Sequence, residues 1–536
     1  MVEEGYDHGK RWWTLVVLCL SLVIVVVGNT VLNVALPTLV RELDASNSAL
    51  QWMVDSYALV FAGLLLTAGA LGDRFGRKGA LQAGLVVFGV ASTVAAFAGS
   101  SGQLIALRAV MGIGAALIMP ATLSILTNVF PPHERAKAIA IWAGLAGAGA
   151  AIGPVTSGFL LEHFWWGSVF LVNVPLVIAA LVGGRFLVPT SRDPNAEQLD
   201  PIGAALSIVG LSGVLYGIIE GPVHGWTAPA TLGSLLSGLA VLVVFGFWEL
   251  RAAHPMLDLR FFKNATFSSA TAAINLVFFA MFGTFFLLTQ YLQLVLGYSA
   301  LEAGVRMLPM PFTMMVAAPS SAKFVEKFGN RKVVSTGLLI LGLGLLLLAQ
   351  SDVDTPYWHL VVAIVTMAAG MGLSMAPSTT GIMASLPLRK AGVGSAVNDT
   401  TRELGGALGV AVLGSMLASR FTAALPGSIE QLPDAAQTAI RSSLGGALGV
   451  ARSLPPAVGG PLEAAAKNAY VDAMSVAMVG AAIVVLATAV MVRRFYPDRL
   501  LMHDAGHGRH HAAPGRVEAD APQPSKPSKP SEPSAA

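Results

Sequence analysis

The chain has 536 residues, of which 54% are hydrophobic and only 12% charged, and its mean hydropathy is +0.68. Soluble domains carry about 25% charged residues, so this composition excludes a soluble globular protein and indicates an integral membrane protein. The net charge of +3 is too small to indicate nucleic-acid binding, and a lone cysteine, Cys19, excludes an intrachain disulfide.

Apolar runs that are long enough to cross a bilayer recur along the whole chain. A spanning helix needs about 20 mostly apolar residues. An all-α membrane protein with an even number of crossings is therefore expected, and an even number places both termini on one side. The fourteen runs that roughly meet this length are 13–36, 48–71, 79–99, 103–126, 138–160, 166–188, 203–219, 230–250, 267–291, 303–322, 333–350, 358–382, 396–418 and 470–492.

The distribution of lysine and arginine predicts which side holds the termini. With the N-terminus in the cytoplasm, most of the 33 basic residues fall in cytoplasmic segments, whereas Arg108 and Arg402 fall within predicted helices. Moving the assignment by one helix would destroy this asymmetry. We therefore expect a multi-pass protein of the plasma or inner membrane with both termini cytoplasmic.

The fourteen runs divide into two groups of six with two further helices between them. Within the second group, residues 420–469 form one long outer loop, and residues 444–454 are apolar enough to lie on the membrane surface. The predicted parts are a cytoplasmic N-terminus (1–12), a first six-helix bundle (13–188), a linker (189–202), two extra helices (203–250), a second linker (251–266), a second six-helix bundle (267–492) and a disordered cytoplasmic tail (493–536).

The connection between the second and third runs concentrates charge and glycine in few residues. Residues 69–78 read GALGDRFGRK, and a weaker copy, AKFVEKFGNRK, occupies residues 322–332. Glycine permits a sharp reversal, and the acid can pair with cations of neighbouring helices. Recurrence at half-chain spacing indicates two internally related bundles, as in secondary transporters. The expected cytoplasmic gate comprises Gly69, Asp73, Arg74, Gly76, Arg77, Lys78, Glu326 and Lys327.

This loop resembles the cytoplasmic loop signature of the major facilitator superfamily, and two further signatures follow in order. Residues 104–114 (LIALRAVMGIG) are similar to its fourth-helix motif, with Arg108 as the arginine. With fourteen helices, the chain resembles the drug:proton antiporters of the QacA/EmrB kind. The resemblance implies a major facilitator fold of two six-helix bundles plus two extra helices. Residues 149–158 (GAAIGPVTSG) are similar to the fifth-helix motif of the antiporters, through Gly149, Gly153, Pro154 and Gly158.

The first helix departs from the pattern of this family. Family members usually carry an acid two residues before the threonine of a motif that residues 30–37 (TVLNVALP) match here. This chain has Gly28 at that position, followed by Asn29. The carboxylate often assigned to proton or cation handling is therefore absent, so either another residue performs its role or the chain lacks proton coupling.

Ionisable residues inside the predicted spans are the candidates for this role, because each costs about 2.5–3.5 kcal/mol or more at a helix centre. Asp55 and Arg108 both lie about 10 Å below the outer surface, at about 1.5 Å of rise per residue. We expect the two to pair and Asp55 to replace the missing acid, so that an arriving proton breaks the pair. The alternative is a permanent structural ion pair.

A second charged cluster lies in the thirteenth run and consists of Asp399, Arg402 and Glu403. Because Arg402 and Glu403 are adjacent in a helix, they point about 100° apart and cannot fully pair with each other. A carboxylate here could bind a proton or a cationic substrate. The alternative is a wet, structural cluster near the cytoplasmic mouth.

Aromatic and thioether side chains at helical spacing predict a substrate cavity. Such faces suit flat, greasy or cationic ligands of varied shape. The alternative is that these stripes face lipid or a neighbouring helix. The expected cavity residues are Asn29, Thr30, Asn33, Phe279, Phe282, Phe286, Met310 and Met314.

The sequence contains no P-loop, and its ten histidines show no metal-ligand spacing within a span. We therefore expect no cofactor, no ATP-driven step and no enzymatic activity. The interpretation is a monomeric, proton-driven exporter of hydrophobic or cationic drugs by alternating access, with membrane lipid as a further partner. One alternative is an exporter of lipid or of an endogenous metabolite on the same fold. A polytopic membrane enzyme and a sensor are the others.

Overall fold

The computed structural model describes residues 8–192, 200–253, 255, 257–386 and 391–497. Within these ranges the regular structure is helical and no β-strand occurs, which confirms the predicted all-α class. The predictions for residues 1–7, for the middle of the first linker and for most of the C-terminal tail concern residues outside the described ranges.

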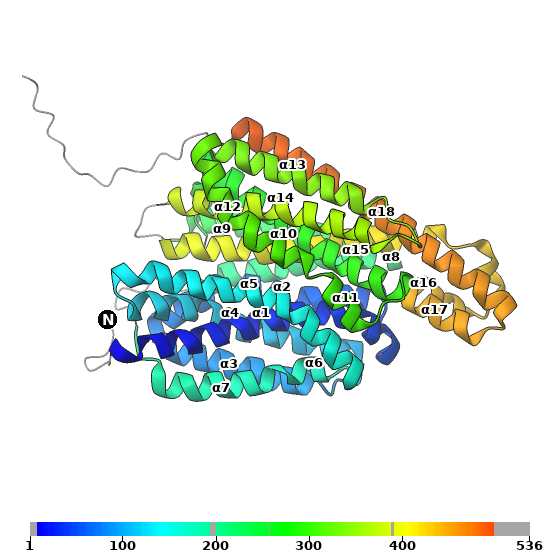
Figure 1. Ribbon diagram of the computed structural model, residues 1–536, viewed down its shortest axis with the longest axis horizontal. Helices are drawn as coiled ribbons and strands as arrows, with labels where there is room; N and C mark the ends of the chain where they lie inside the picture. The colour runs from blue at the N-terminus through cyan, green and yellow to red at the C-terminus, as the bar shows by residue number, and fades with distance from the viewer. Residues whose placement is uncertain (1–7, 193–199, 254, 256, 387–390, 498–536) are drawn as a thin grey trace, which may run out of the picture. The chain divides into compact units, whose positions relative to one another are not determined.

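The first bundle consists of seven α-helices, because the sixth predicted run is divided into α6 and α7, and a short 3-10 helix precedes them. Figure 1 draws these segments in blue to cyan. The segments are η1 (His8–Lys10), a short 3-10 helix, followed by α1 (Arg11–Glu42), α2 (Asn47–Phe75), α3 (Arg77–Ala95), α4 (Ser101–Val129), α5 (Pro132–His163), α6 (Ser168–Leu171) and α7 (Asn173–Leu187).

The two extra helices and the second bundle follow. The tenth predicted run is divided at Pro309, which begins a helix because its ring cannot continue the preceding one. The segments are α8 (Pro201–His224), α9 (Pro229–Arg251), η2 (Leu259–Lys263), α10 (Ala265–Gln290), the π-helical η3 (Tyr291–Val295), α11 (Ala300–Arg306), α12 (Pro309–Phe328), α13 (Asn330–Leu348), α14 (Tyr357–Ala384), α15 (Ala391–Ala424), η5 (Gly427–Gln431), α16 (Asp434–Ser442), α17 (Leu444–Ser453) and α18 (Pro456–Phe495).

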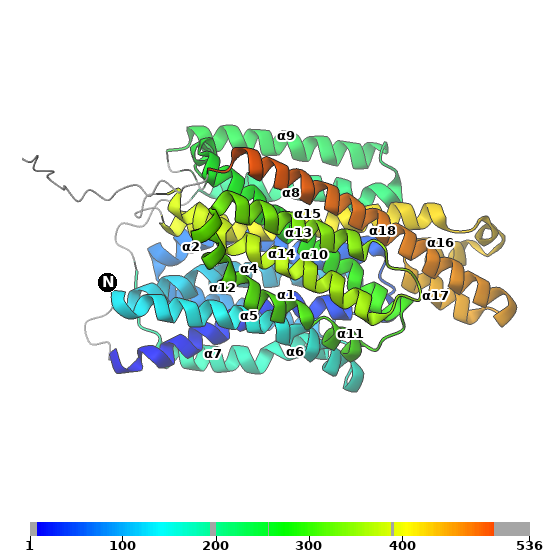
Figure 2. The ribbon, with the colours of Figure 1, turned by 45° about the horizontal axis from the view of Figure 1, so that its top comes forward.

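Every one of the fourteen predicted apolar runs coincides with helix. Among the described residues, twelve helices are both long and apolar enough to cross a membrane. The helices α5 and α12 are not among these twelve, so the count of fourteen spans stays a prediction. In Figures 1 and 2, α1 begins and α18 ends at the same end of the molecule, as an even number of crossings requires.

The two bundles repeat one pattern of helix pairing. In the first, α1 packs on α5, and α4 packs on both α2 and α3. In the second, α10 packs on α15, and α14 packs on both α12 and α13. The chain reversals repeat as well: Gly76 (φ 122°) lies between α2 and α3, and Gly329 (φ 82°) lies between α12 and α13. The weak sequence copy therefore occupies the structurally equivalent turn.

The extra helix α8 packs against both bundles at once, along α2 and α15. One apolar cluster combines Ala58 and Leu59 of α2 with residues of α8 and with Ala407 and Ala411 of α15. Helix α9 packs on α8 and lies at the periphery (Figure 2). We call the line of contact between α2 and α15 the α2–α15 seam. Helix α8 covers this seam.

The segment predicted as an outer loop, residues 420–469, is mostly helical, which corrects that prediction. Helix α15 continues to Ala424, and α16, α17 and the first turns of α18 follow. The apolar side chains of α17, among them Leu444 and Leu448, are buried, and α17 packs on α18 and α1. These side chains therefore face protein rather than the membrane surface. The prolines at 433 and 455 sit at helix starts, where their missing N–H is harmless.

We predict that Gly76→Ala and Gly329→Ala destabilise the fold by about 1–3 kcal/mol each, because both positions have a positive φ that side chains rarely adopt. Thermal unfolding in detergent measures the effect. Gly79→Ala is the matched control, since Gly79 is helical and has open space around it. Its replacement should stabilise by about 0.5–1 kcal/mol. Equal behaviour of all three variants would contradict the repeated-turn assignment.

Candidate functional site

Arg108 lies on α4 and is completely buried at the centre of the first bundle. Its Nε donates to the carbonyl of Met53 and its Nη1 to the carbonyl of Gly28, both at 2.9 Å. The guanidinium carbon lies 4.3 Å from the ring centroid of Tyr57, a cation–π contact. Arg108 thus joins α1, α2 and α4 through neutral partners.

Asp55 lies on α2, two residues beyond Met53, and is also completely buried. The expected ion pair with Arg108 is not formed: among the described residues, neither carboxyl oxygen of Asp55 has a hydrogen-bond partner. Backbone carbonyls hold two nitrogens of Arg108, and its Nη2 has no partner among the described residues. The first bundle therefore contains a buried acid without a partner and a buried arginine with one spare donor.

Arg108 contacts Gly28, which occupies the position of the missing first-helix acid. A Cβ at Gly28 would lie 2.5 Å from Cζ of Phe88 on α3, so this ring fills the room that a side chain would need. Phe88 is fully buried, and its own backbone packs against Gly114 of α4. The ring cannot easily move away. Glycine at this position thus agrees with the packing around it, and its carbonyl supplies the oxygen that Arg108 binds.

The charged residues of α15 diverge, as their adjacency in the helix predicts. Arg402 lies with its Nη1 3.8 Å from Asp399, its Nη2 3.4 Å from the hydroxyl of Thr379 on α14 and its guanidinium 5.4 Å from the ring of Phe278 on α10. These contacts keep Arg402 within the second bundle.

Glu403 faces a different environment from its neighbour. Its charge interacts electrostatically with Arg108 and with Tyr57, both of which belong to the first bundle. The acid that senses Arg108 across the two bundles is therefore Glu403, although Asp55 is nearer in sequence. Asp399 and Arg402 also act on Glu403, so Glu403 links the charged cluster of α15 to Arg108 of the first bundle.

The glycines of α5 divide between two neighbours. Gly149 packs against Val26, and Gly153 against Thr30, both on α1. One turn and more beyond, a Cβ at Gly158 would lie 2.5 Å from the Cα of Leu301 on α11. Gly304 of α11 is packed just as tightly, because a Cβ added at this position would lie 2.5 Å from the carbonyl oxygen of Pro154. Helix α5 therefore joins α1 within its bundle and touches the second bundle near its C-terminal end.

The predicted gate residues of the first bundle bind one another and their own bundle. Asp73 accepts from Nε of Arg77 at 2.6 Å and from the hydroxyl of Ser124 on α4 at 3.1 Å. The ammonium of Lys78 donates to the carbonyl of Arg185 on α7.

Four other gate residues lie in different surroundings. Arg74 lies over the ring of Phe75, and Gly69 packs on Pro120 of α4. In the second bundle, Glu326 and Lys327 are exposed at the end of α12. The structure thus does not bring the two halves of the predicted gate into contact through Asp73 or Arg77.

The predicted cavity residues differ in burial. Phe279, Phe286 and Met310 belong to the packed core, and a core position leaves no surface for a ligand. The other five are less enclosed or polar: Phe282 stacks on Phe278 at 6.1 Å, Met314, Asn29 and Thr30 are half-buried, and Asn33 is buried with an unpartnered side-chain oxygen.

Two hollows in the described part of the chain contain none of these eight residues. One lies between α1 and α5, and the other lies between the ends of α13 and α15 and the first half of α18.

Comparison with known proteins identifies the family. Residues 18–410 match the model of the Major Facilitator Superfamily. The chain belongs to this superfamily. It is 37% identical to the multidrug efflux pump LfrA of Mycolicibacterium smegmatis over 485 residues, which cover 90% of this chain and 96% of LfrA. It is 36% identical to the methyl viologen resistance protein SmvA of Salmonella typhimurium, over 90% of this chain and 97% of SmvA.

Two further likenesses agree with this assignment. The tetracenomycin C resistance and export protein of Streptomyces glaucescens is 31% identical over 92% of this chain and 93% of its own length. A solved bacterial homologue of the human lysosomal transporter Spinster has the same fold, with a TM-score of 0.65, 19% identity and coverage of 91% of this chain and 98% of the other. This major facilitator protein is therefore a multi-pass membrane transporter and not an enzyme.

Sequence reasoning missed two residues of this major facilitator site. Tyr57 carries the ring beneath Arg108. Gln51 lies one turn before Asp55 on the same face of α2, is fully buried with both amide atoms unpartnered among the described residues, and packs on Gly414 of α15. The spacing of Gln51 and Asp55, four residues apart, is the signal that could have revealed a polar face directed at the second bundle.

We predict that Gly158→Ala impairs transport by this major facilitator protein far more than Gly149→Ala. A Cβ at 158 would meet the backbone of α11 at 2.5 Å, whereas a Cβ at 149 would lie 3.3 Å from the movable side chain of Val26. The rigid clash prevents α5 and α11 from meeting at this contact, so Gly158→Ala should fold but transport slowly. Substrate efflux at matched protein levels checks this. Equal activity of the two variants would contradict it.

We predict that Gly28→Asp destabilises the protein by about 1–3 kcal/mol, the usual cost of overpacking a core, because the new side chain meets Phe88. The double variant Gly28→Asp/Phe88→Ala should recover part of that loss, since the cavity left by the ring accepts the carboxylate beside Arg108. Thermal unfolding of both variants and of Phe88→Ala alone measures the coupling between the two positions. Additive effects would show that the ring does not exclude an acid.

Proposed function

We propose that this protein is a proton-coupled exporter of hydrophobic or cationic compounds and works by alternating access. In this proposal it has fourteen spans with both termini cytoplasmic, as in the QacA/EmrB-like antiporters. The names of the relatives, a multidrug efflux pump and resistance proteins, support the cargo. The single observation that carries the coupling is the complete burial of Asp55 without a partner among the described residues.

Asp55 carries the proton in this proposal because an isolated, ionised carboxylate costs far more to bury than its neutral acid. Loss of the proton leaves a negative charge that needs a cation, and the spare Nη2 of Arg108 is the donor available in the same bundle. Deprotonation therefore favours a rearrangement of α2 against α4 that brings the two groups together. A cationic substrate would compete with Arg108 for the same charge.

Glu403 is the second carrier, and its role follows from its interaction with Arg108 across the bundles. An ionised Glu403 attracts Arg108 and favours close approach of α15 to the first bundle. A protonated Glu403 releases this attraction. Because Asp55 and Glu403 draw on one arginine, a change of proton at either acid alters the balance between the two bundle arrangements. Asp399 and Arg402 set the local charge that Glu403 experiences.

The contacts at the two ends of the bundles support an assignment of this structure to one state of the proposed transport cycle. At one end, α5 meets α11 through Gly158 and Gly304, and Glu162 of α5 accepts from the backbone N–H of Leu301. At the other end, Asp73 and Arg77 bond within the first bundle. We assign this arrangement to the state with the outer ends together and the gate released. In the opposite state the gate cations would contact the end of α12 near Glu326.

We predict that Asp55→Asn and Glu403→Gln each lower dye efflux from proteoliposomes under an imposed pH gradient by roughly 10- to 100-fold, the range of typical coupling free energies. The neutral side chains keep the size but cannot take up or release a proton. Substrate exchange without a pH gradient should persist, because binding and rocking do not require titration. Dye fluorescence on both sides of the membrane measures the two activities.

The matched control is Glu42→Gln, which removes an exposed carboxylate at the end of α1 and should leave efflux at the parent level. Normal gradient-driven efflux by both Asp55→Asn and Glu403→Gln would refute the assignment of proton carriers. Loss of exchange together with efflux would indicate that the acids bind substrate rather than protons alone.

A further inference from the structure

A hollow on the side of the molecule between α1 and α5 is lined by apolar side chains and the thiol of Cys19. Its volume is about 380 Å³. Cys19 is 4% exposed and forms part of the floor, whereas Val16 is 55% exposed and lies at the open side. The hollow is therefore a groove that opens outward from the helix pair. No charged side chain lines it.

The length of this groove matches one leaflet of a bilayer. Along α1 the lining runs from Trp12 to Val23. At about 1.5 Å of rise per residue this is about 16 Å, and the hydrocarbon core of a bilayer is about 30 Å thick. The groove thus extends from the membrane surface, where tryptophan is enriched, to about the middle of the bilayer. An extended acyl chain has this shape and chemistry.

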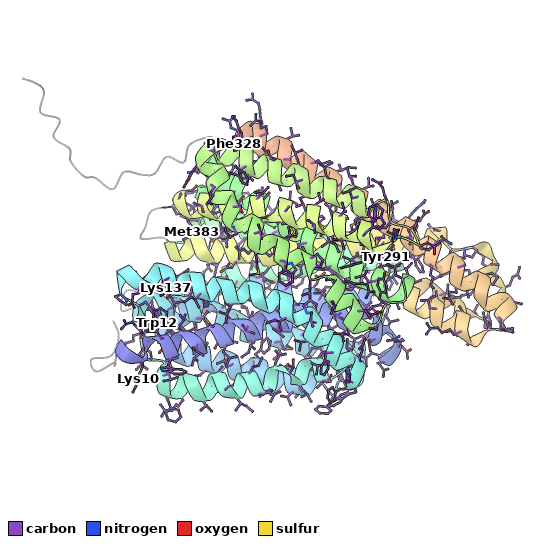
Figure 3. The ribbon with its side chains drawn as sticks, in the orientation of Figure 1. Lys10, Trp12, Lys137, Tyr291, Phe328 and Met383 are labelled. Carbon is purple, nitrogen blue, oxygen red and sulfur yellow. The ribbon has the colours of Figure 1, made fainter. Side chains whose placement is uncertain are left out.

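Two lysines lie at the Trp12 end of the groove, as the labels of Figure 3 show. The ammonium of Lys137 on α5 lies 5.4 Å from the ring of Trp12, and Lys10 precedes α1. Both side chains are exposed, and no carboxylate within the described ranges pairs with either. Their neighbour Arg11 differs, because Glu134 of α5 binds it at 2.7 and 3.0 Å.

We propose that this groove binds one anionic phospholipid, with an acyl chain along α1 and the phosphate between Lys10 and Lys137. Apolar lining accounts for the chain, and two unneutralised ammonium groups at the mouth account for the negative headgroup. A zwitterionic lipid would bring its own cation to these lysines and lose the electrostatic gain. Juxtamembrane basic residues attract anionic lipid in this way.

The site has a structural consequence because α1 and α5 are the helices that the glycine motif joins. Gly149 packs on Val26, one turn beyond the deep end of the groove at Val23. An acyl chain that fills the groove adds contacts to both helices next to the start of the glycine motif at Gly149. Bound lipid therefore stabilises the α1–α5 pair, independently of which substrate is exported or how protons are coupled.

Native mass spectrometry of the delipidated full chain in detergent tests the proposal. Phosphatidylglycerol and phosphatidylcholine with the same acyl chains are the two probes. We expect the parent to retain phosphatidylglycerol preferentially. Lys137→Gln should weaken that retention about fivefold and Lys10→Gln/Lys137→Gln roughly 25-fold, from the usual contribution of a basic residue at an anionic surface. Retention of phosphatidylcholine should not change.

Three further variants keep the test decisive. Lys263→Gln removes an exposed cation of η2 away from the groove and should bind phosphatidylglycerol like the parent. Lys10→Arg/Lys137→Arg should preserve binding, since charge is retained. Val16→Trp should abolish it by filling the groove. Unchanged retention in Lys10→Gln/Lys137→Gln or in Val16→Trp overturns the proposal, and so does equal loss of both lipids. Each variant must show the parent's melting temperature in lipid-free detergent.

Discussion

A charge inside hydrocarbon must find its partners within the protein, and the burial of Arg108 shows how this chain meets that requirement. Two backbone carbonyls and one aromatic ring hold the guanidinium. These carbonyls come within reach because glycines let the helices approach: a Cβ at Gly112 would lie 2.7 Å from the carbonyl of Tyr57. The placement of Arg108 thus depends on the close packing of α1, α2, α3 and α4.

Neutral partners hold two nitrogens of Arg108 without cancelling its charge, and its Nη2 has no partner among the described residues. The charge remains available to acids, and Glu403 of the second bundle interacts with it electrostatically. Helix α8 bears on the same region, because it covers the α2–α15 seam. Trp52 of α2 donates to Glu220 of α8, and Ser415 of α15 donates to the carbonyl of Ile218. One helix is thereby bonded to both bundles, so α8 ties α2 to α15 along the seam.

The sequence predicted the helices, the repeated turn at Gly76 and Gly329, and the divergence of Arg402 from Glu403, because spacing alone determines each of these. The partners of Arg108 could not be predicted, since a backbone carbonyl leaves no mark in the sequence. The faces of Phe279 and Phe286 were equally hidden, because α10 is apolar all round and periodicity then does not separate core from cavity. Helices α16 and α17 were missed because Pro433, which precedes α16, resembles a loop residue, and because the sequence does not reveal the tertiary contacts of α17.

The two neighbours of α5 constrain any motion of the bundles. Gly149 and Gly153 hold α5 against α1, whereas Gly158 holds its far end against α11. Separation of these parts of α5 and α11 would release only the second contact, since the first lies inside a bundle. Pro154 follows Gly153, removes a backbone hydrogen bond from the helix and has its carbonyl against Gly304 of α11. The helix is consequently weakest to bending where its packing on α1 gives way to its packing on α11, so the motif places flexibility at the boundary between the two bundles.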